Sequence, residues 1–174
     1  MYYYQNPFYS CYPFIQRNSI YYPYTQSQSI NRTVPYQQPK TDYGKDPFTL
    51  NIAQAARNNN TYRTAIWTGD HLQVTVMSIN VGDDIGLEIH PNTDQFLRIE
   101  QGQGLVQMGD NPQNPNNLTF QANVFEDSAI MVPAGTWHNI INTGPTPLKL
   151  YTIYAPPHHP YGTIQMTKAD AMES

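Results

Sequence analysis

After residue 62 the chain is a series of short apolar segments separated by turn residues, and this pattern restricts its fold more than any other feature. Leu72, Val74 and Val76 occupy every second position, which is the period of a strand buried on one face. Further apolar runs follow at 85–89, 96–99, 104–108, 129–132, 139–141 and 148–154. Glycine, asparagine, aspartate or proline lies between successive runs. Many short strands with regular turn signals predict an all-β sandwich or barrel.

Residues 1–46 have a different composition from the rest of the chain. They contain 10 of the 14 tyrosines, many prolines and glutamines, and no leucine. Because they carry too few aliphatic side chains to offset the entropy of ordering, we predict a disordered tail. This tail is either a passive extension or an assembly segment whose tyrosines stack or become cross-linked. Cys11 is the only cysteine, which excludes intramolecular disulfides and thiolate metal clusters.

Ordered structure is expected to begin at Asp46-Pro47, because aspartate suits a helix N-cap and proline the first helical position. Apolar residues at helical spacing predict one short helix over residues 47–57, ended by three asparagines. The sequence therefore divides into a tail (1–46), a helix and linker (47–62), a β-barrel (63–157) and a C-terminal extension (158–174).

The charge balance excludes several classes of partner. The net charge is −4 and only 13% of the residues are charged, so there is no basic surface for nucleic acid or anionic lipid. No apolar run approaches the roughly 18 residues that a membrane span requires. The first five residues lack the basic and apolar regions of a secretory signal peptide, which predicts a cytoplasmic protein.

Two segments carry residues that bind metals. Glu88 and His90 are two positions apart on a predicted strand, so their side chains leave the same face. Gln95 opens the next strand after a turn, and His138 follows the turn at Pro133–Gly135. Together these four side chains would form a site for one divalent ion, of the Mn, Fe, Co, Ni or Zn type. The alternative is that Glu88 and His90 lie on the solvent-exposed face of an ordinary strand and bind no metal.

Both segments resemble the conserved motifs of the cupin superfamily. Residues 133–142 match the second motif, P-x-G-x-x-H-x-x-x-N, with His138 at the histidine position. Residues 82–102 are similar to the first motif, G-x5-H-x-H-x3–4-E-x6-G. The resemblance covers roughly residues 63–157. It implies a double-stranded β-helix, or jelly-roll barrel, with a metal ion inside it and a homodimer as the assembly.

The sequence departs from the cupin pattern at three positions. Glu88 replaces the first histidine, Gln95 replaces the glutamate, and Asp127 replaces the opening glycine of the second motif. The site therefore keeps one carboxylate, but at a different coordination position around the ion. Gln95 is either a weak ligand or a residue that supports a ligand by a hydrogen bond. Glu88, if it leaves the ion, is our candidate general base.

The closer likeness is to small single-domain bacterial cupins of type 2, which are loosely called mannose-6-phosphate-isomerase-like. A phosphosugar would require Arg or Lys at its phosphate. Arg98 is the only such residue within the motif strands, and alternation places it on the face opposite Gln95. His158-His159 lies in a proline-rich segment that is either a solvated loop or a lid over the barrel.

Two functions remain open at this stage. The first is a metal-dependent enzyme for a small molecule, with oxygenase (dioxygenase) or isomerase chemistry at a site formed by Glu88, His90, Gln95 and His138. The second is a non-catalytic structural or ligand-binding cupin. The tyrosine-rich tail resembles bacterial spore-coat proteins, which implies deposition in the coat through residues 1–46 after synthesis in the mother cell.

Overall fold

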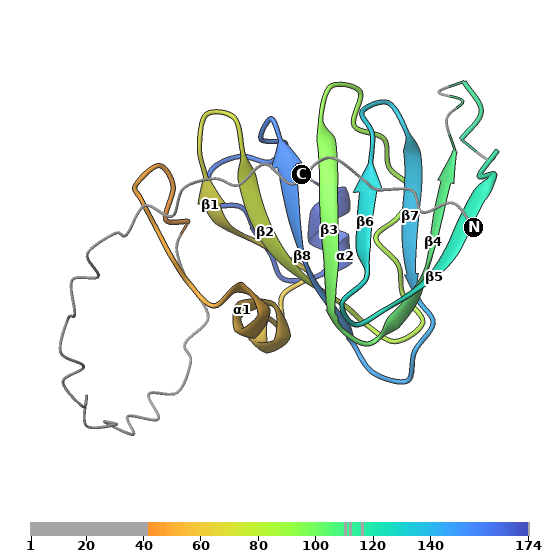
Figure 1. Cartoon of the computed structure of the whole chain (residues 1–174), viewed down its shortest axis with the longest axis horizontal. Coiled ribbons are helices and arrows are strands. Elements are labelled where there is room, and N and C mark those ends of the chain that lie inside the picture. The colour runs from red at the N-terminus through yellow and green to blue at the C-terminus, as the bar shows by residue number, and fades with distance from the viewer. Residues whose placement is uncertain (1–41, 110, 112, 116, 174) are drawn as a thin grey trace, which may run out of the picture. The chain divides into compact units, whose positions relative to one another are not determined.

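The computed structural model describes residues 42–109, 111, 113–115 and 117–173. The predicted all-β fold is confirmed: the described residues form two antiparallel sheets and only two short helices (Figure 1). The larger sheet has the strand order β6-β3-β8-β2-β1-β9, and the smaller sheet has the order β5-β4-β7. The strands are β1 (Arg63–Thr68), β2 (Gln73–Ile79), β3 (Asp94–Gln101), β4 (Gln103–Gly109), β5 (Phe120–Phe125), β6 (Ala129–Val132), β7 (Trp137–Asn142), β8 (Leu148–Ala155) and β9 (Ile164–Gln165).

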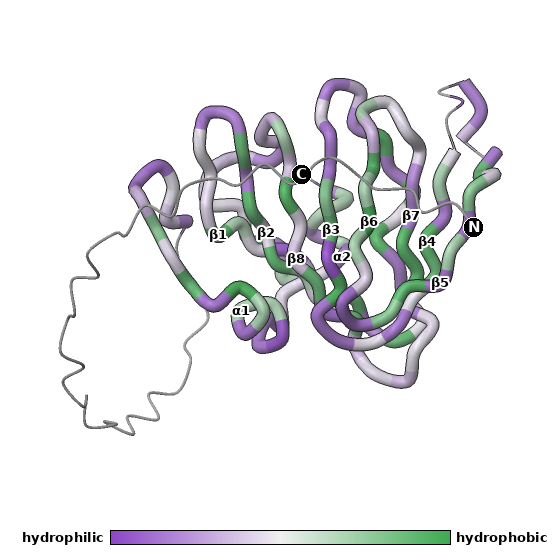
Figure 2. The backbone as a smooth tube through the Cα atoms, in the orientation of Figure 1, coloured by the Kyte–Doolittle hydropathy of each residue, from purple (hydrophilic) through white to green (hydrophobic). Residues whose placement is uncertain are grey.

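The core lies between the two sheets. In Figure 2, hydrophobic residues are concentrated along the strands, while hydrophilic residues are frequent in the turns that join them. Leu97 and Leu150 of the larger sheet pack in one cluster with Val106 and Ile140 of the smaller sheet, and all four are almost completely buried. Burial of such side chains stabilises a fold by about 1.5–3 kcal/mol each. This core holds the two sheets together.

The N-terminal helix α1 (Ile52–Asn58) begins later than the sequence predicts. Its N-cap is Asn51, whose side chain accepts a hydrogen bond from the backbone N–H of Gln54. The predicted cap, Asp46-Pro47, instead precedes an extended segment in which Phe48 stacks on Tyr43. Phe48 also lines an apolar groove with Trp67, so tertiary packing outweighs the local capping signal.

The described structure includes residues that precede the predicted boundary at residue 46. The Asp42 side chain is buried and accepts hydrogen bonds from the Thr68 hydroxyl and from the backbone N–H groups of Gly44 and Gly162. Residues 1–41 of the predicted disordered tail, Cys11 among them, lie outside the described residues, so this prediction stays untested there. Residues 42–46 belong to the folded domain.

The C-terminal extension is part of the same domain. β9 pairs with β1, and the short helix α2 (Lys168–Met172) follows it with a capping box between Thr167 and Asp170. Lys168 forms ion pairs with Asp83 and Asp84, which tie α2 to the loop after β2. Among the described residues, neither helix is long and apolar enough to span a bilayer.

Candidate metal centre

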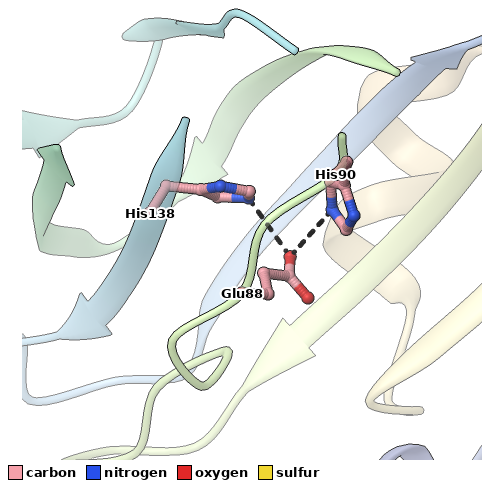
Figure 3. A group of neighbouring side chains, drawn as sticks. All are labelled: Glu88, His90 and His138. Atoms are coloured by element: carbon pink, nitrogen blue, oxygen red, sulfur yellow. Dashed lines mark ion pairs between the residues drawn. The ribbon is translucent and has the colours of Figure 1, made fainter. Parts of the chain in front are cut away.

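The segment 84–90 places two of the predicted ligands beside the third. It does not form a regular strand of either sheet, as the sequence predicts for 85–89, but makes isolated bridges to β7. The backbone N–H of Glu88 donates to the carbonyl oxygen of His138 at 3.0 Å, and that of His138 donates to Glu88 at 2.9 Å. The backbone N–H of Gly135 donates to the carbonyl oxygen of His90. These bonds bring Glu88, His90 and His138 to one point (Figure 3).

One carboxylate oxygen lies at the centre of this group. Glu88 Oε1 is 3.3 Å from Nε2 of His138 and 3.4 Å from Nε2 of His90. One ligand atom from each of the three residues lies within 4.8 Å of the other two. Both histidines are buried, and the Glu88 side chain is 23% exposed. Glu88, His90 and His138 thus lie together, and their role as metal ligands stays a prediction.

The tautomer of His138 determines what this cluster can bind. Its Nδ1 lies 3.0 Å from the carbonyl oxygen of Thr136, which can only accept, so Nδ1 carries the proton. In the neutral ring, Nε2 then presents a lone pair to Glu88 Oε1, and two acceptors face each other. No hydrogen-bond partner is present for Glu88 Oε1 or for the Nε2 atoms of His90 and His138 within the described part of the chain. A positive charge among these three atoms would satisfy all of them.

The distances from Glu88 Oε1 to the two imidazole nitrogens fit a shared metal ion. Two ligand atoms that each lie about 2.1 Å from one ion, at an angle of about 90–110°, are about 3.0–3.4 Å apart. The separations of 3.3 and 3.4 Å agree with this range. The bond from His138 to Thr136 is also the kind of outer contact that orients a metal-binding imidazole. The donor set of one carboxylate and two imidazoles suits Mn, Fe, Co, Ni or Zn.

The charge of Glu88 also favours a cation. Burial of this carboxyl raises its pKa, but hydrogen bonds from the imidazoles of His138 and His90, which require a proton on each Nε2, and the positive charge of Arg63 lower it more. The net result holds the pKa of Glu88 well below its usual range. Glu88 is consequently a carboxylate at neutral pH and is ready to bind a metal without losing a proton first.

Gln95 lies in β3 and is almost completely buried. Its amide Nε2 donates to the hydroxyl of Thr152 at 3.1 Å, whereas its Oε1 has no hydrogen-bond partner among the residues that the structure describes. In the register of β3 and β8, Gln95 is opposite Tyr154, whose ring is 5.7 Å from that of His90. Gln95 is thus positioned near the cluster, and its role as a ligand stays a prediction.

Comparison with known proteins identifies the family. Residues 75–154 match the model of the cupin domain. The uncharacterized protein YrkC of Bacillus subtilis is 66% identical over 131 residues, which are 75% of this chain and 69% of YrkC. This chain belongs to the cupin family. The protein L612 of Acanthamoeba polyphaga mimivirus is 41% identical over 122 residues, 70% of this chain and 72% of L612.

A solved structure supports the same assignment. The crystal structure of BH2720 from Bacillus halodurans is 62% identical to this cupin and superposes with a TM-score of 0.74. The match covers 77% of this chain and 99% of BH2720. The double-stranded β-helix expected from the two motifs is therefore confirmed.

One departure from the cupin motifs has a clear structural explanation. Asp127, at the glycine position of the second motif, has a φ of 69°, which is the left-handed region that favours glycine. Aspartate tolerates this conformation better than most residues, and Arg98 holds its carboxylate at 2.6 Å. Arg98 also pairs with Glu100. It is therefore engaged away from the metal centre, as strand alternation predicts.

Arg63, which the sequence did not single out, lies in β1 outside both motifs. Arg63 is buried, and its Nη2 is 3.9 Å from Oε2 of Glu88. Its Nη1 donates to the side-chain oxygen of Gln165 at 2.9 Å. No local spacing connects residue 63 with residue 88, so the only available signal was a charged residue within a predicted strand. Tyr154 lies beside Arg63, and burial raises the pKa of Tyr154 to about 12.

The segment of residues 156–160, here called the mouth segment, is held over the cluster. The ring of His158 is 3.9 Å from that of His90 between centroids, although its other side is exposed. The buried side chain of Gln73 accepts the backbone N–H groups of His158 and His159 and donates to the carbonyl oxygen of His159. Pro156, His158 and Pro160 are exposed, so the segment is in contact with solvent, while Gln73 anchors its backbone to the barrel.

Both histidines of the mouth segment favour the neutral form. Burial lowers the pKa of His159 to about 3, and the positive charge of Arg63 contributes to the shift. Burial and the neighbouring His90 also lower the pKa of His158. A cavity of about 510 Å³ opens beside the metal centre, and both histidines line it with Arg63 and Glu88.

Proposed function

We propose that this cupin is a metal-dependent enzyme that acts on a small molecule. One divalent ion would be held by Glu88, His90 and His138, with Gln95 supporting it from β3. The observation that carries the proposal is a group of three buried atoms that have no hydrogen-bond partner among the described residues: Glu88 Oε1 and, 3.3–3.4 Å from it, the Nε2 atoms of His90 and His138. One positive charge between them would satisfy all three. When bound, the ion would act as a Lewis acid or a redox centre.

The residues around the ion support a catalytic site rather than a closed structural one. Three protein ligands leave coordination positions for water or substrate, as catalytic metal sites require. The adjoining cavity of about 510 Å³ is within the range for small-molecule sites. The ring of His158 lies tilted against that of His90, 3.9 Å away between centroids, on one side of the site.

Individual side chains can perform defined steps. Glu88 is charged at neutral pH, which suits it as a ligand, and its lowered pKa makes it a weak base while it stays in this environment. It would act as a general base only after it leaves the ion. Tyr154 keeps its phenolic proton, because its raised pKa lies far above neutrality, and can donate a hydrogen bond. Oxygenase and isomerase chemistry are both compatible with these groups.

The test begins with the metal-free protein, reloaded separately with Mn, Fe, Co, Ni and Zn. Oxygen uptake would reveal an oxygenase, and interconversion of aldoses and ketoses would reveal an isomerase, over a panel of small organic acids and sugars. We expect turnover that requires one ion per chain and is lost in His138→Ala, while the exposed His71→Ala retains it. Turnover that survives removal of the metal, or a protein that binds no ion, would contradict the proposal.

A further inference from the structure

The cavity beside the metal centre has one cationic side chain in its wall. Its lining includes Arg63 and Glu88 at the inner end, apolar Pro160 and Ile164, and Asp170 at α2. Asp170 is engaged in the capping box of α2, where its carboxylate accepts the backbone N–H of Thr167. The wall contains no lysine among the described residues. The guanidinium is therefore the group that distinguishes one class of ligand from another.

Arg63 has hydrogen-bonding capacity that the protein does not use. Its side chain is only 4% exposed, and its buried Nε has no hydrogen-bond partner among the described residues. Its Nη2 is 3.9 Å from Oε2 of Glu88, which is too far for a hydrogen bond. A buried guanidinium with an unused donor is costly unless a ligand completes its hydrogen bonds.

Glu88 links this guanidinium to the metal centre. Its Oε1 faces the two imidazoles and its Oε2 faces Arg63, so the two positive sites are separated by a single carboxylate. With a divalent ion bound, one carboxylate cannot neutralise both the ion and the guanidinium. The inner end of the cavity then has a net positive charge, which favours an anionic ligand.

We propose that the cavity binds a small carboxylic acid whose carboxylate contacts Arg63 while its body lies towards Pro160 and Ile164. The planar fork of arginine matches a carboxylate. A dianionic phosphate would be poorly neutralised by one guanidinium. This inference rests on the proposed function, because the ion supplies part of the positive charge, and it names the substrate class for the same site.

The test is calorimetric titration of the full chain, metal-loaded and metal-free, with pyruvate, its neutral amide pyruvamide, and inorganic phosphate. We expect the metal-loaded protein to bind pyruvate about tenfold or more tighter than pyruvamide, as a charge-assisted hydrogen bond would give. Phosphate should bind more weakly than pyruvate. The comparison of charged pyruvate with neutral pyruvamide uses only the wild-type protein, so it does not depend on the folding of a mutant.

Variants then assign the preference to one residue. Arg63→Gln should reduce pyruvate binding to the level of pyruvamide, and Arg63→Lys should retain part of it. The matched control Arg57→Gln removes an arginine of α1 that pairs with Glu126, and should bind pyruvate as the wild type does. A preference for pyruvate that persists in Arg63→Gln, equal binding of the two probes, or tighter binding of phosphate would overturn the inference.

The two proposals fail in different ways. A protein that takes up no ion contradicts the proposed function. In that case, pyruvate binding that depends on Arg63 in the metal-free protein still supports the inference, and binding that is absent or independent of Arg63 overturns it. A protein that binds its ion but does not prefer the carboxylate contradicts the inference alone.

Discussion

The site has two halves that are encoded in different ways: an inner half of Glu88, His90 and His138, and an outer half of Arg63, Gln165 and the mouth segment. The three metal-facing residues come from two short segments inside the cupin match at 75–154. Arg63, Gln165 and the mouth segment come from outside that match and meet only through the pairing of β1 with β9 and the contacts of Gln73. In our proposals the inner half holds the ion and the outer half selects the ligand.

The largest effect is expected for the inner half. His90→Ala and His138→Ala should each reduce metal affinity by more than about 100-fold, because even outer-shell changes at metal sites cost about 10–100-fold. The measurement is the metal content of the protein after desalting, with His71→Ala as an exposed control. Metal content like that of the wild type in both variants would remove the distinction between the two halves.

Gln95 tests how far the inner half extends. If its buried Oε1 supports or binds the ion, Gln95→Ala should reduce metal affinity by about tenfold, less than either histidine variant. Competition with a chromogenic chelator measures this affinity, and Gln121→Ala in the exposed part of β5 is the matched control. Unchanged affinity in Gln95→Ala would confine the metal centre to Glu88, His90 and His138.

Substitution of Gln73 should make the backbone of the mouth segment more mobile without reducing the metal content. Gln73→Leu removes the bonds to His158 and His159, and we expect faster exchange of these two backbone amides in hydrogen-exchange measurements. The unpaired groups should also lower the free energy of unfolding by about 1–3 kcal/mol. Gln54→Leu, on the exposed face of α1, is the control. Loss of metal in Gln73→Leu would show that the two halves are one unit.

A smaller effect is expected where α2 is attached. Burial raises the pKa of Asp84, but the hydrogen bonds from Lys168 and from the backbone N–H of Gly86 lower it by more. The net result is a pKa below the ordinary value of 3.8. A carboxylate with a depressed pKa stabilises the fold above its unfolded pKa, and the contribution disappears as the pH falls through the folded value.

Lys168→Met should therefore lower the free energy of unfolding by about 1 kcal/mol or less at pH 7, since the pair is partly exposed. The difference from the wild type should shrink as the pH falls below 3.8. Thermal unfolding across this range measures it, with Lys45→Met as the control for an exposed pair. A difference that grows towards acid pH would contradict the assignment.

The smallest effect on the site is expected from the tail. Removal of residues 1–41 should leave metal content and melting temperature unchanged, while removal of 1–46 should lower the melting temperature by breaking the bonds of Asp42. Light scattering measures the particle size of the same proteins. It tests assembly through the tail, and it also tests the homodimer that the cupin resemblance implies. Identical particle sizes with and without the tail would contradict the assembly hypothesis.

The sequence predicted the inner half because its geometry is local. Glu88 and His90 are two positions apart, and His138 follows a turn whose glycine, Gly135, has a φ of 77°. The outer half could not be predicted in this way. Arg63 reaches Glu88 only through the strand order, and His158 reaches His90 only because a buried glutamine from β2 holds its backbone. The start of α1 was missed because Phe48 packs in a tertiary groove.

The most direct test of the metal centre is anomalous X-ray diffraction at the absorption edge of the ion, from crystals of the metal-loaded protein. The geometry predicts one peak per chain, about 2.1 Å from Glu88 Oε1 and from Nε2 of His90 and His138. A protein that is fully loaded in solution but has its peak elsewhere, or has none at these three atoms, would contradict the assignment.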